Sequence, residues 1–215
     1  MEEAAAKLFN TGSVSVSGCS RTDAGVHANC FRCNFKTEKQ LPHETVVSGM
    51  NFFLPDDIAV FACESVPDDF DARFSCKGKE YVYRICNTPI RDPFYLHRAL
   101  FYRLPLDEVF LDQQAKAYIG THDFTALRAI GSNVKTTVRT VTDASVFREG
   151  DIVTFRVSAD GFLYNMVRIM VGTLLYISEG KIEAGSIPSI IASQDRTLAG
   201  KTVPPEGLYL NQVYY

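Results

Sequence analysis

Apolar residues alternate with polar ones along several stretches of the chain, and this period of two predicts β-strands. We expect strands at SVSVS, with Val14 and Val16 facing inward, and at CFRCNF, DIAVFACESV, EYVYRIC and the terminal GLYLNQVYY. The stretch TVTDASVFREGDIVTFRVSAD predicts a hairpin that turns at EGD and places Val153, Phe155 and Val157 on one face.

Other stretches repeat their apolar residues with helical spacing. They predict helices at EEAAAKLF, LPHETVVSGMNFFL, PLDEVFLDQQAKAYIG (ending at Gly120), DGFLYNMVRIMVGTLLYISEG (closed by Gly180) and SIPSIIASQD (capped by Ser186). Strands and helices are interleaved and hairpins are frequent, so the pattern indicates an α+β fold with mainly antiparallel sheet. The turn-forming cluster PDDFD suggests a junction, which divides the chain into halves 1–70 and 71–215.

Composition narrows the class of protein without naming its chemistry. The chain has 215 residues, of which 46% are apolar and 22% charged, as is typical of a globular domain. Its first fifteen residues lack the basic and apolar pattern of a signal peptide, and its most apolar stretch carries Asn165 and Arg168, so we expect a cytoplasmic protein without a membrane span. Six cysteines are therefore expected to be free thiols, and the single CxxC of Cys30 and Cys33, placed on a strand, does not favour zinc.

Charge is unevenly distributed along the chain. The net charge is −3, but residues 1–70 carry −5, residues 71–139 carry +4 and residues 140–215 carry −2. The basic middle segment permits a local groove for a polyanion, although so modest an excess is also compatible with scatter.

The stretch SRTDAGVHA places Arg21 and Asp23 beside a glycine, either as an ordinary turn or as a rigid loop that holds a reactive carboxylate. Arg168 lies in an almost wholly apolar helix, where a buried arginine needs an anionic partner. Asp23 is the natural candidate, the alternative being an arginine that extends into water at a groove edge. An ionised aspartate can act as a nucleophile or as an electrostatic stabiliser, and is a poor general acid.

Tyr81 and Tyr83 share one face of a strand in the basic segment. Two interpretations stay open: a platform on which bases stack, or ordinary core tyrosines. His27 follows Asp23 by four residues and could form an Asp–His pair, but no nucleophile motif, metal-binding spacing or glycine-rich phosphate loop accompanies it.

Six segments in order resemble the tRNA pseudouridine synthase A family: SRTDAGVHA, NFFLPDDIAV, DDFDARFSCKGKEYVYRI, YIGTHDFTALR, GFLYNMVRIMVG and DRTLAGKTVPPEGLYL. They span essentially the whole chain. The resemblance implies two α+β halves whose mainly antiparallel sheets abut to form a central sheet, with helices outside and an active-site cleft between the halves. Members normally begin with a further strand and loop, so we expect that segment to be lacking here.

The resemblance also implies isomerisation of uridine to pseudouridine in the anticodon arm of tRNA, typically at positions 38 to 40. By the matching motifs Asp23 is the catalytic nucleophile, Tyr81 stacks on the target base, Arg168 pairs with Asp23, and Arg21 holds the flipped base or contacts the backbone. The attack on the ribose C1′ proceeds through a direct adduct or through a glycal. No metal or organic cofactor is implied, and the family usually works as a homodimer.

Three alternatives remain from the sequence. The chain could be a non-catalytic RNA-binding module in which Asp23 only partners Arg168, or a hydrolase that uses Asp23 and His27 with water. It could also be a pseudouridine synthase that acts on another RNA.

Overall fold

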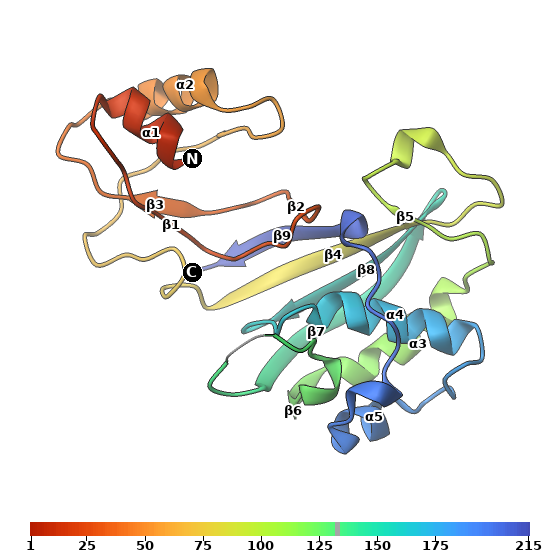
Figure 1. Ribbon diagram of the computed structural model, residues 1–215. Helices are drawn as coiled ribbons and strands as arrows, with labels where there is room; N and C mark the ends of the chain where they lie inside the picture. The colour runs from red at the N-terminus through yellow and green to blue at the C-terminus, as the bar shows by residue number, and fades with distance from the viewer. Residues whose placement is uncertain (132–133) are drawn as a thin grey trace. The chain divides into compact units, whose positions relative to one another are not determined.

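The computed structural model describes residues 1–131 and 134–215, which form two compact units (Figure 1). The first unit consists of Met1–Arg21 and Phe31–Cys76, and the second of Thr22–Cys30 and Lys77–Tyr215. Both units combine helices with sheet, and most strand pairs are antiparallel, which confirms the predicted α+β class. No helix among the described residues is both long and apolar enough to span a bilayer.

The first unit packs two helices, α1 (Glu2–Phe9) and α2 (His43–Phe53), with an antiparallel pair of short strands, β1 (Val16–Gly18) and β3 (Cys33–Phe35). Apolar side chains of both helices fill its core, together with one residue that precedes β1: Ala4, Ala5, Phe9, Val14, Val46 and Met50. The two helices and the two strands follow the predicted pattern, although both strands are shorter than predicted.

The strand predicted at 57–66 is wrong, because this segment has no strand geometry. The side-chain amide of Asn51 forms the two hydrogen bonds that a strand partner would form with Val60. Its Nδ2 donates to the Val60 carbonyl and its Oδ1 accepts from the Val60 N–H, both at 2.7 Å. The backbone groups of Val60 are therefore paired with a helix side chain and not with a neighbouring strand.

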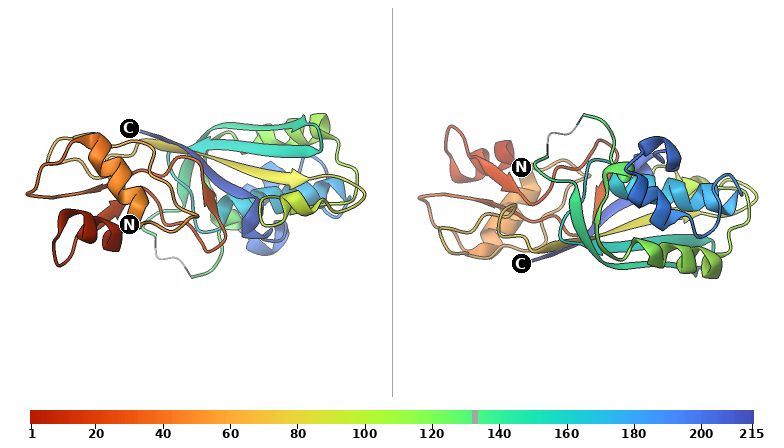
Figure 2. Two further views of the ribbon diagram at one scale, coloured as in Figure 1. Left: turned by 90° about the horizontal axis from the view of Figure 1, so that it is seen from above. Right: turned by 90° about the horizontal axis from the view of Figure 1, so that it is seen from below.

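A seven-stranded sheet organises the second unit, in the order β2-β9-β4-β8-β7-β6, with β5 attached to β4. Its strands are β2 (His27–Ala28), β4 (Gly78–Cys86), β5 (Leu100–Phe101), β6 (Gly120–Asp123), β7 (Val138–Glu149), β8 (Ile152–Ala159) and β9 (Leu208–Tyr214). The long ribbons of β4, β7 and β8 run alongside one another in the two further views (Figure 2). The predicted hairpin is present as β7 and β8, and Val153, Phe155 and Val157 are buried on one face.

Three α-helices pack in the second unit: α3 (Glu108–Ala115), α4 (Met166–Ser178) and α5 (Ile187–Ser193). Five 3₁₀ turns complete the described elements: η1 (Pro93–Tyr95), η2 (Lys116–Tyr118), η3 (Thr125–Leu127), η4 (Arg196–Leu198) and η5 (Pro205–Gly207). Helix α3 contacts β7, and α4 contacts both α3 and β4 (Figure 1). As predicted, α4 is buried on most sides and is followed by Gly180 in the left-handed region, with φ +68°.

The helix predicted over 160–180 begins only at Met166, and two further helix ends differ in detail from the prediction. Helix α3 ends at Ala115 and not at Gly120, because the chain turns so that Tyr118 enters the core, where its hydroxyl donates to the Met170 carbonyl. Ser186 precedes α5 as predicted, but its hydroxyl donates back to the Glu183 carbonyl and does not cap the helix.

A close backbone crossing ties α4 to the segment that follows η4. A Cβ on Gly172 would lie 1.8 Å from the Lys201 carbonyl oxygen, and one on Gly200 would lie 2.3 Å from the Gly172 backbone. The Gly200 N–H donates to the Thr173 hydroxyl at 2.9 Å. Only glycine fits at these two positions, so the crossing fixes where the chain after α5 passes over α4.

The loop that carries Asp23 belongs to the second unit, since the strand that follows it, β2, pairs with β9. Cys30 ends this loop, whereas Cys33 begins β3 of the first unit, so the two cysteines do not share a strand as the sequence pattern suggested. All six cysteines are free thiols in the structure. The division into halves 1–70 and 71–215 stays a prediction.

Candidate active site

Arg168 is the single charged residue of helix α4, and its side chain is 15% exposed. The helix buries apolar residues on both sides of it, including Val167 and Ile169. A guanidinium in such surroundings needs acceptors for its N–H groups, because unpaired buried charge is strongly destabilising.

Three hydrogen bonds meet this requirement. The Arg168 Nε donates to the Val203 carbonyl at 2.7 Å, and Nη1 donates to Asn165 Oδ1 at 2.7 Å and to Asp23 Oδ2 at 3.2 Å. The ion pair predicted between Arg168 and Asp23 is therefore confirmed. The guanidinium is planar, and its Nε is bound to the Val203 carbonyl while its Nη1 contacts the Asp23 carboxylate. Arg168 therefore limits the directions in which the Asp23 carboxylate can turn.

Asp23 opens a tight turn in which the Val26 N–H donates to the Asp23 carbonyl at 3.0 Å. Gly25 takes φ +82° in this turn, a conformation that favours glycine, and a Cβ there would lie 3.1 Å from Pro205 Cγ. The side chain of Asp23 is 35% exposed, so one part of it faces Arg168 while another stays accessible. The turn reading of this stretch is thus correct, and the turn also presents a carboxylate.

Tyr81 lies in the same sheet as the strand that follows this turn. In the register of the sheet Leu210 of β9 pairs with Ala28 of β2 on one side and with Tyr81 of β4 on the other. The Tyr81 ring packs edge-to-face on Phe162 with ring centroids 5.0 Å apart, and it is largely buried. The sheet therefore connects Tyr81 to the Asp23 loop through a single intervening strand.

Tyr83 does not belong to a stacking platform, and this part of the platform interpretation is wrong. Its side chain has no exposed surface, and its hydroxyl donates to the Pro204 carbonyl at 2.7 Å. Burial raises the pKa of Tyr83 far above its usual range, and the nearby Glu206 carboxylate adds to the effect. Tyr83 is a core residue that anchors the segment leading into β9.

Arg21 lies at the end of the first segment of the first unit and is exposed. Asp23 and Arg168 therefore contact each other directly, and the sheet connects Tyr81 to the Asp23 loop. The role of Arg21 at the site stays a prediction, made from its position two residues before Asp23.

Two contributors to the site were not predicted. Asn165, in the left-handed conformation with φ 59° just before α4, supplies its amide oxygen to Arg168, and Val203 supplies a carbonyl from a distant segment. His27, which the sequence analysis weighed as a partner of Asp23, stacks on Tyr209 and has its Nε2 2.7 Å from the His97 carbonyl oxygen. The one signal in the sequence was the position of Asn165 three residues before Arg168, since residues that far apart are neighbours at a helix terminus.

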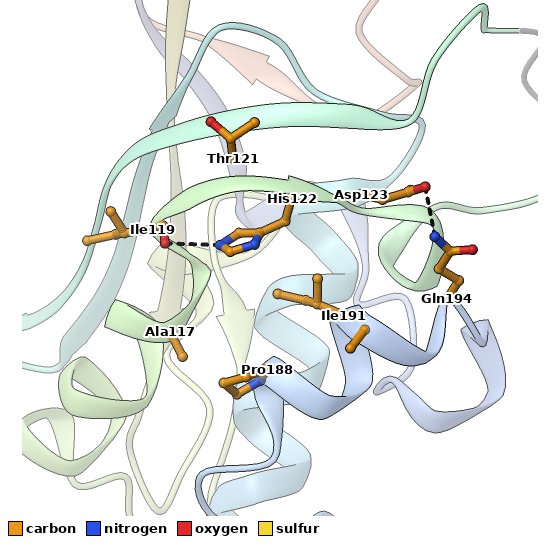
Figure 3. A pocket seen from close by; sticks show the side chains of 9 residues that line it. Ala117, Ile119, Thr121, His122, Asp123, Pro188, Ile191 and Gln194 are labelled. Atoms are coloured by element: carbon orange, nitrogen blue, oxygen red, sulfur yellow. Dashed lines mark hydrogen bonds between the residues drawn. The ribbon is translucent and has the colours of Figure 1, made fainter.

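A hollow of about 460 Å³ lies elsewhere in the second unit, between β6 and α5 (Figure 3). Its polar groups bind one another: His122 Nε2 is 3.2 Å from the Ile119 carbonyl oxygen, and Gln194 donates to Asp123. Burial opposes ionisation of Asp123, yet hydrogen bonds from Thr125 and Thr137 hold the pKa of this carboxyl below its usual range. The hollow contains none of the residues that the sequence analysis selected, and its polar groups serve the fold. Among the described residues no group of three or more His, Cys, Asp or Glu side chains could hold a metal ion.

Comparison with known proteins agrees with the resemblance. A family model described as tRNA pseudouridine synthase matches residues 114–215. The tRNA pseudouridine synthase A of Acetivibrio thermocellus is 46% identical over 213 residues, which are 99% of this chain and 87% of that protein. Those of Ruminiclostridium cellulolyticum and Clostridium acetobutylicum are 43% and 45% identical, covering 100% and 94% of this chain and 88% and 83% of theirs.

The chain belongs to the tRNA pseudouridine synthase A family. This membership confirms the family that six ordered segments of the sequence indicated. Asp23, which the resemblance implied as the nucleophile, is the partly exposed carboxylate that Arg168 contacts in this structure.

Proposed function

We propose that this chain isomerises uridine to pseudouridine in the anticodon stem-loop of tRNA, typically at positions 38 to 40, with Asp23 as the nucleophile. The observation that carries the assignment of Asp23 is its ion pair with Arg168, whose guanidinium also donates to Asn165 and to the Val203 carbonyl. Family membership supports the reaction itself, and the ion pair supports the choice of residue.

In the proposed reaction the N1–C1′ glycosidic bond of uridine breaks while Asp23 attacks the ribose or assists formation of a glycal. The detached uracil turns, and a C5–C1′ bond forms as the Asp23–C1′ bond breaks or, in the glycal route, as C2′ regains its proton. The hydrogen on C5 is then lost as a proton and N1 takes up a proton, so the change is a net isomerisation without oxidant, reductant or cofactor. An aspartate suits these steps because it supplies negative charge or a nucleophile without having to donate a proton.

The remaining roles are those that the family resemblance implies. Tyr81 contacts the flipped base, Arg168 orients Asp23, and Arg21 contacts the RNA near the target nucleotide. Taking a base out of its stack costs a few kcal/mol, which contacts to the surrounding RNA must offset, and the basic segment 71–139 is suited to provide them. We further propose that the protein acts as a cytoplasmic homodimer and that the chain folds as halves 1–70 and 71–215.

The test is to map pseudouridine in tRNA transcripts after reaction with the native chain, with Asp23→Asn and with Asp151→Asn. Asp151 is an exposed aspartate in the turn between β7 and β8, and it serves as the matched control. We expect modification at positions 38 to 40 by the native chain and by Asp151→Asn, and none by Asp23→Asn despite retained tRNA binding. Equal modification by Asp23→Asn would refute the assignment of the nucleophile.

Replacing the uridine at each of the three positions by cytidine, one at a time, tests the substrate. Loss of product only at the replaced position supports the anticodon arm as the target. Product at other uridines or in another RNA would overturn the proposed substrate and keep the reaction.

A further inference from the structure

Two aromatic rings form a stack beside the turn that carries Asp23. The His27 ring lies on the Tyr209 ring with centroids 4.5 Å apart and planes 18° from parallel. The Arg84 guanidinium lies over the same tyrosine ring, 4.5 Å from its centroid. The stack therefore joins β2, β9 and β4 through side chains, in addition to the backbone ladder that joins these strands.

Both rings also bind two consecutive carbonyls of one loop. His27 Nε2 lies 2.7 Å from the His97 carbonyl oxygen, and the Tyr209 hydroxyl donates to the Arg98 carbonyl at 2.6 Å. His97 adopts the left-handed conformation, with φ 59°, which is uncommon for a residue other than glycine. The loop thus holds a locally unfavourable backbone conformation that these hydrogen bonds help to maintain.

The partner of His27 determines its tautomer. A carbonyl oxygen can only accept, so Nε2 of His27 carries the hydrogen and donates it. The Nε2 of His27 is thus used in a contact with the His97 loop, and Nδ1 is the single acceptor of the neutral ring. His27 is thereby oriented by its hydrogen bond and by the stack together.

The backbone carries this anchoring to Asp23 within four residues. Asp23 and Val26 close the turn through a hydrogen bond, and His27 follows as the first residue of β2, paired in register with Tyr209. Strand β2 has only two residues, so its ladder contributes few backbone hydrogen bonds. Past the strand the Asn29 and Cys30 N–H groups donate to the Leu210 carbonyl, and the side-chain contacts of His27 add to this pairing at the end nearer the turn.

We propose that His27 is a positioning residue, which fixes the turn of Asp23 so that the carboxylate keeps its direction relative to Arg168 during the reaction. The inference rests on the proposed function of Asp23. Its step is geometric: His27 transfers no proton and touches no reacting atom, and it acts through the backbone from His27 to Asp23. Misplacing a reactive group by about 1 Å can cost a factor of about 100 in rate.

The test compares His27→Ala, His27→Gln and His27→Phe with the control His43→Ala. His43 also has its Nε2 in a hydrogen bond, 3.0 Å from the Ser65 hydroxyl, but it lies in the first unit on α2. The single-turnover rate is measured by release of tritium from tRNA labelled at uridine C5, with enzyme in excess, alongside the Kd for tRNA and the midpoint of thermal unfolding.

We expect His27→Ala to lower the single-turnover rate by about 10- to 100-fold while the Kd for tRNA changes by less than about twofold. His27→Gln keeps an N–H donor and should recover part of the rate, and His27→Phe keeps the stack and should recover a different part. His43→Ala should keep the native rate.

Two results would overturn the inference. If His27→Ala reacts at the native rate, the turn does not need this anchor. If all three variants are equally inactive yet fold and bind tRNA like the native chain, His27 takes part in the chemistry directly. A native chain that releases no tritium would refute the proposed function itself, and is thereby distinguishable from both results.

Discussion

Replacing Arg168 by lysine should weaken both the fold and the reaction, because the three hydrogen bonds of Arg168 leave its guanidinium in different directions. Its Nε and Nη1 each reach a neutral acceptor at 2.7 Å, and Nη1 also reaches Asp23 at 3.2 Å. Lysine keeps the charge but has one nitrogen and no planar fork, so it cannot replace all three contacts.

The structure sets the size of the effect. Hydrogen bonds that involve a charged group contribute about 1.5 to 3 kcal/mol each, so losing two of them in a side chain only 15% exposed should lower the free energy of unfolding by about 3 kcal/mol or more. The rate of tritium release should fall as well, because Asp23 loses the partner that orients it. The assays are urea denaturation and single-turnover tritium release at a urea concentration at which the variant remains folded.

Arg148→Lys provides the matched control. Arg148 also makes three hydrogen bonds through two nitrogens, to Glu108, Asn87 and the Leu106 carbonyl, and its side chain is 26% exposed. This variant should lose a comparable amount of stability and keep its rate per folded molecule. The reasoning is refuted if Arg168→Lys unfolds at the native urea concentration and reacts at the native rate.

Three further predictions concern the packing, the backbone and the ionisation of the second unit. Gly172→Ala should lower the free energy of unfolding, measured in urea, by about 2 kcal/mol or more, because the new Cβ would meet the Lys201 carbonyl. The control Gly12→Ala should keep the native stability, because no atom lies within 4 Å of its new Cβ. Equal urea midpoints for the two variants would contradict the close crossing. Asn165→Ala should be less stable than Asn165→Gly by about 1 kcal/mol, because alanine disfavours the left-handed conformation at φ 59°. Both variants should react more slowly than the native chain, because Arg168 loses an acceptor. If Asn165→Ala is the more stable variant, this account is excluded. Burial and the hydrogen bond to Glu179 raise the pKa of Tyr102 to about 12 from 10.0, so the folded state retains this proton when the unfolded state has lost it. The stability that Tyr102 contributes is complete below pH 10 and declines up to about pH 12. The denaturation midpoint of Tyr102→Phe should therefore decline less over that range than the midpoint of the native chain. Equal declines in the two proteins would contradict the raised pKa of Tyr102.

The sequence predicted the central contact of the site because one strong physical constraint identifies it. Arg168 is a lone charge in an apolar helix, and such a charge requires a carboxylate wherever that carboxylate lies in the chain. Asp23 could be chosen because its turn-forming neighbours already marked a fixed loop.

What the sequence did not predict depends on contacts between distant segments. The alternation at 57–66 looks like a strand, but whether a strand forms depends on a backbone partner, and Asn51 takes that place. The stack of His27 on Tyr209 follows from the register of β2 against β9, which no local pattern specifies. Tyr81 and Tyr83 likewise share a strand face, and their different surroundings are set by Phe162 and Pro204.

Tritium release from tRNA transcripts labelled at uridine C5 tests the central claim most directly, since a C5–C1′ bond cannot form without expelling that hydrogen. The native chain and Asp23→Asn are compared at tRNA concentrations that saturate both, with binding measured in parallel. We predict release by the native chain and none by Asp23→Asn at undiminished binding. Release by Asp23→Asn at the native rate would contradict the claim that the carboxylate paired with Arg168 is the nucleophile.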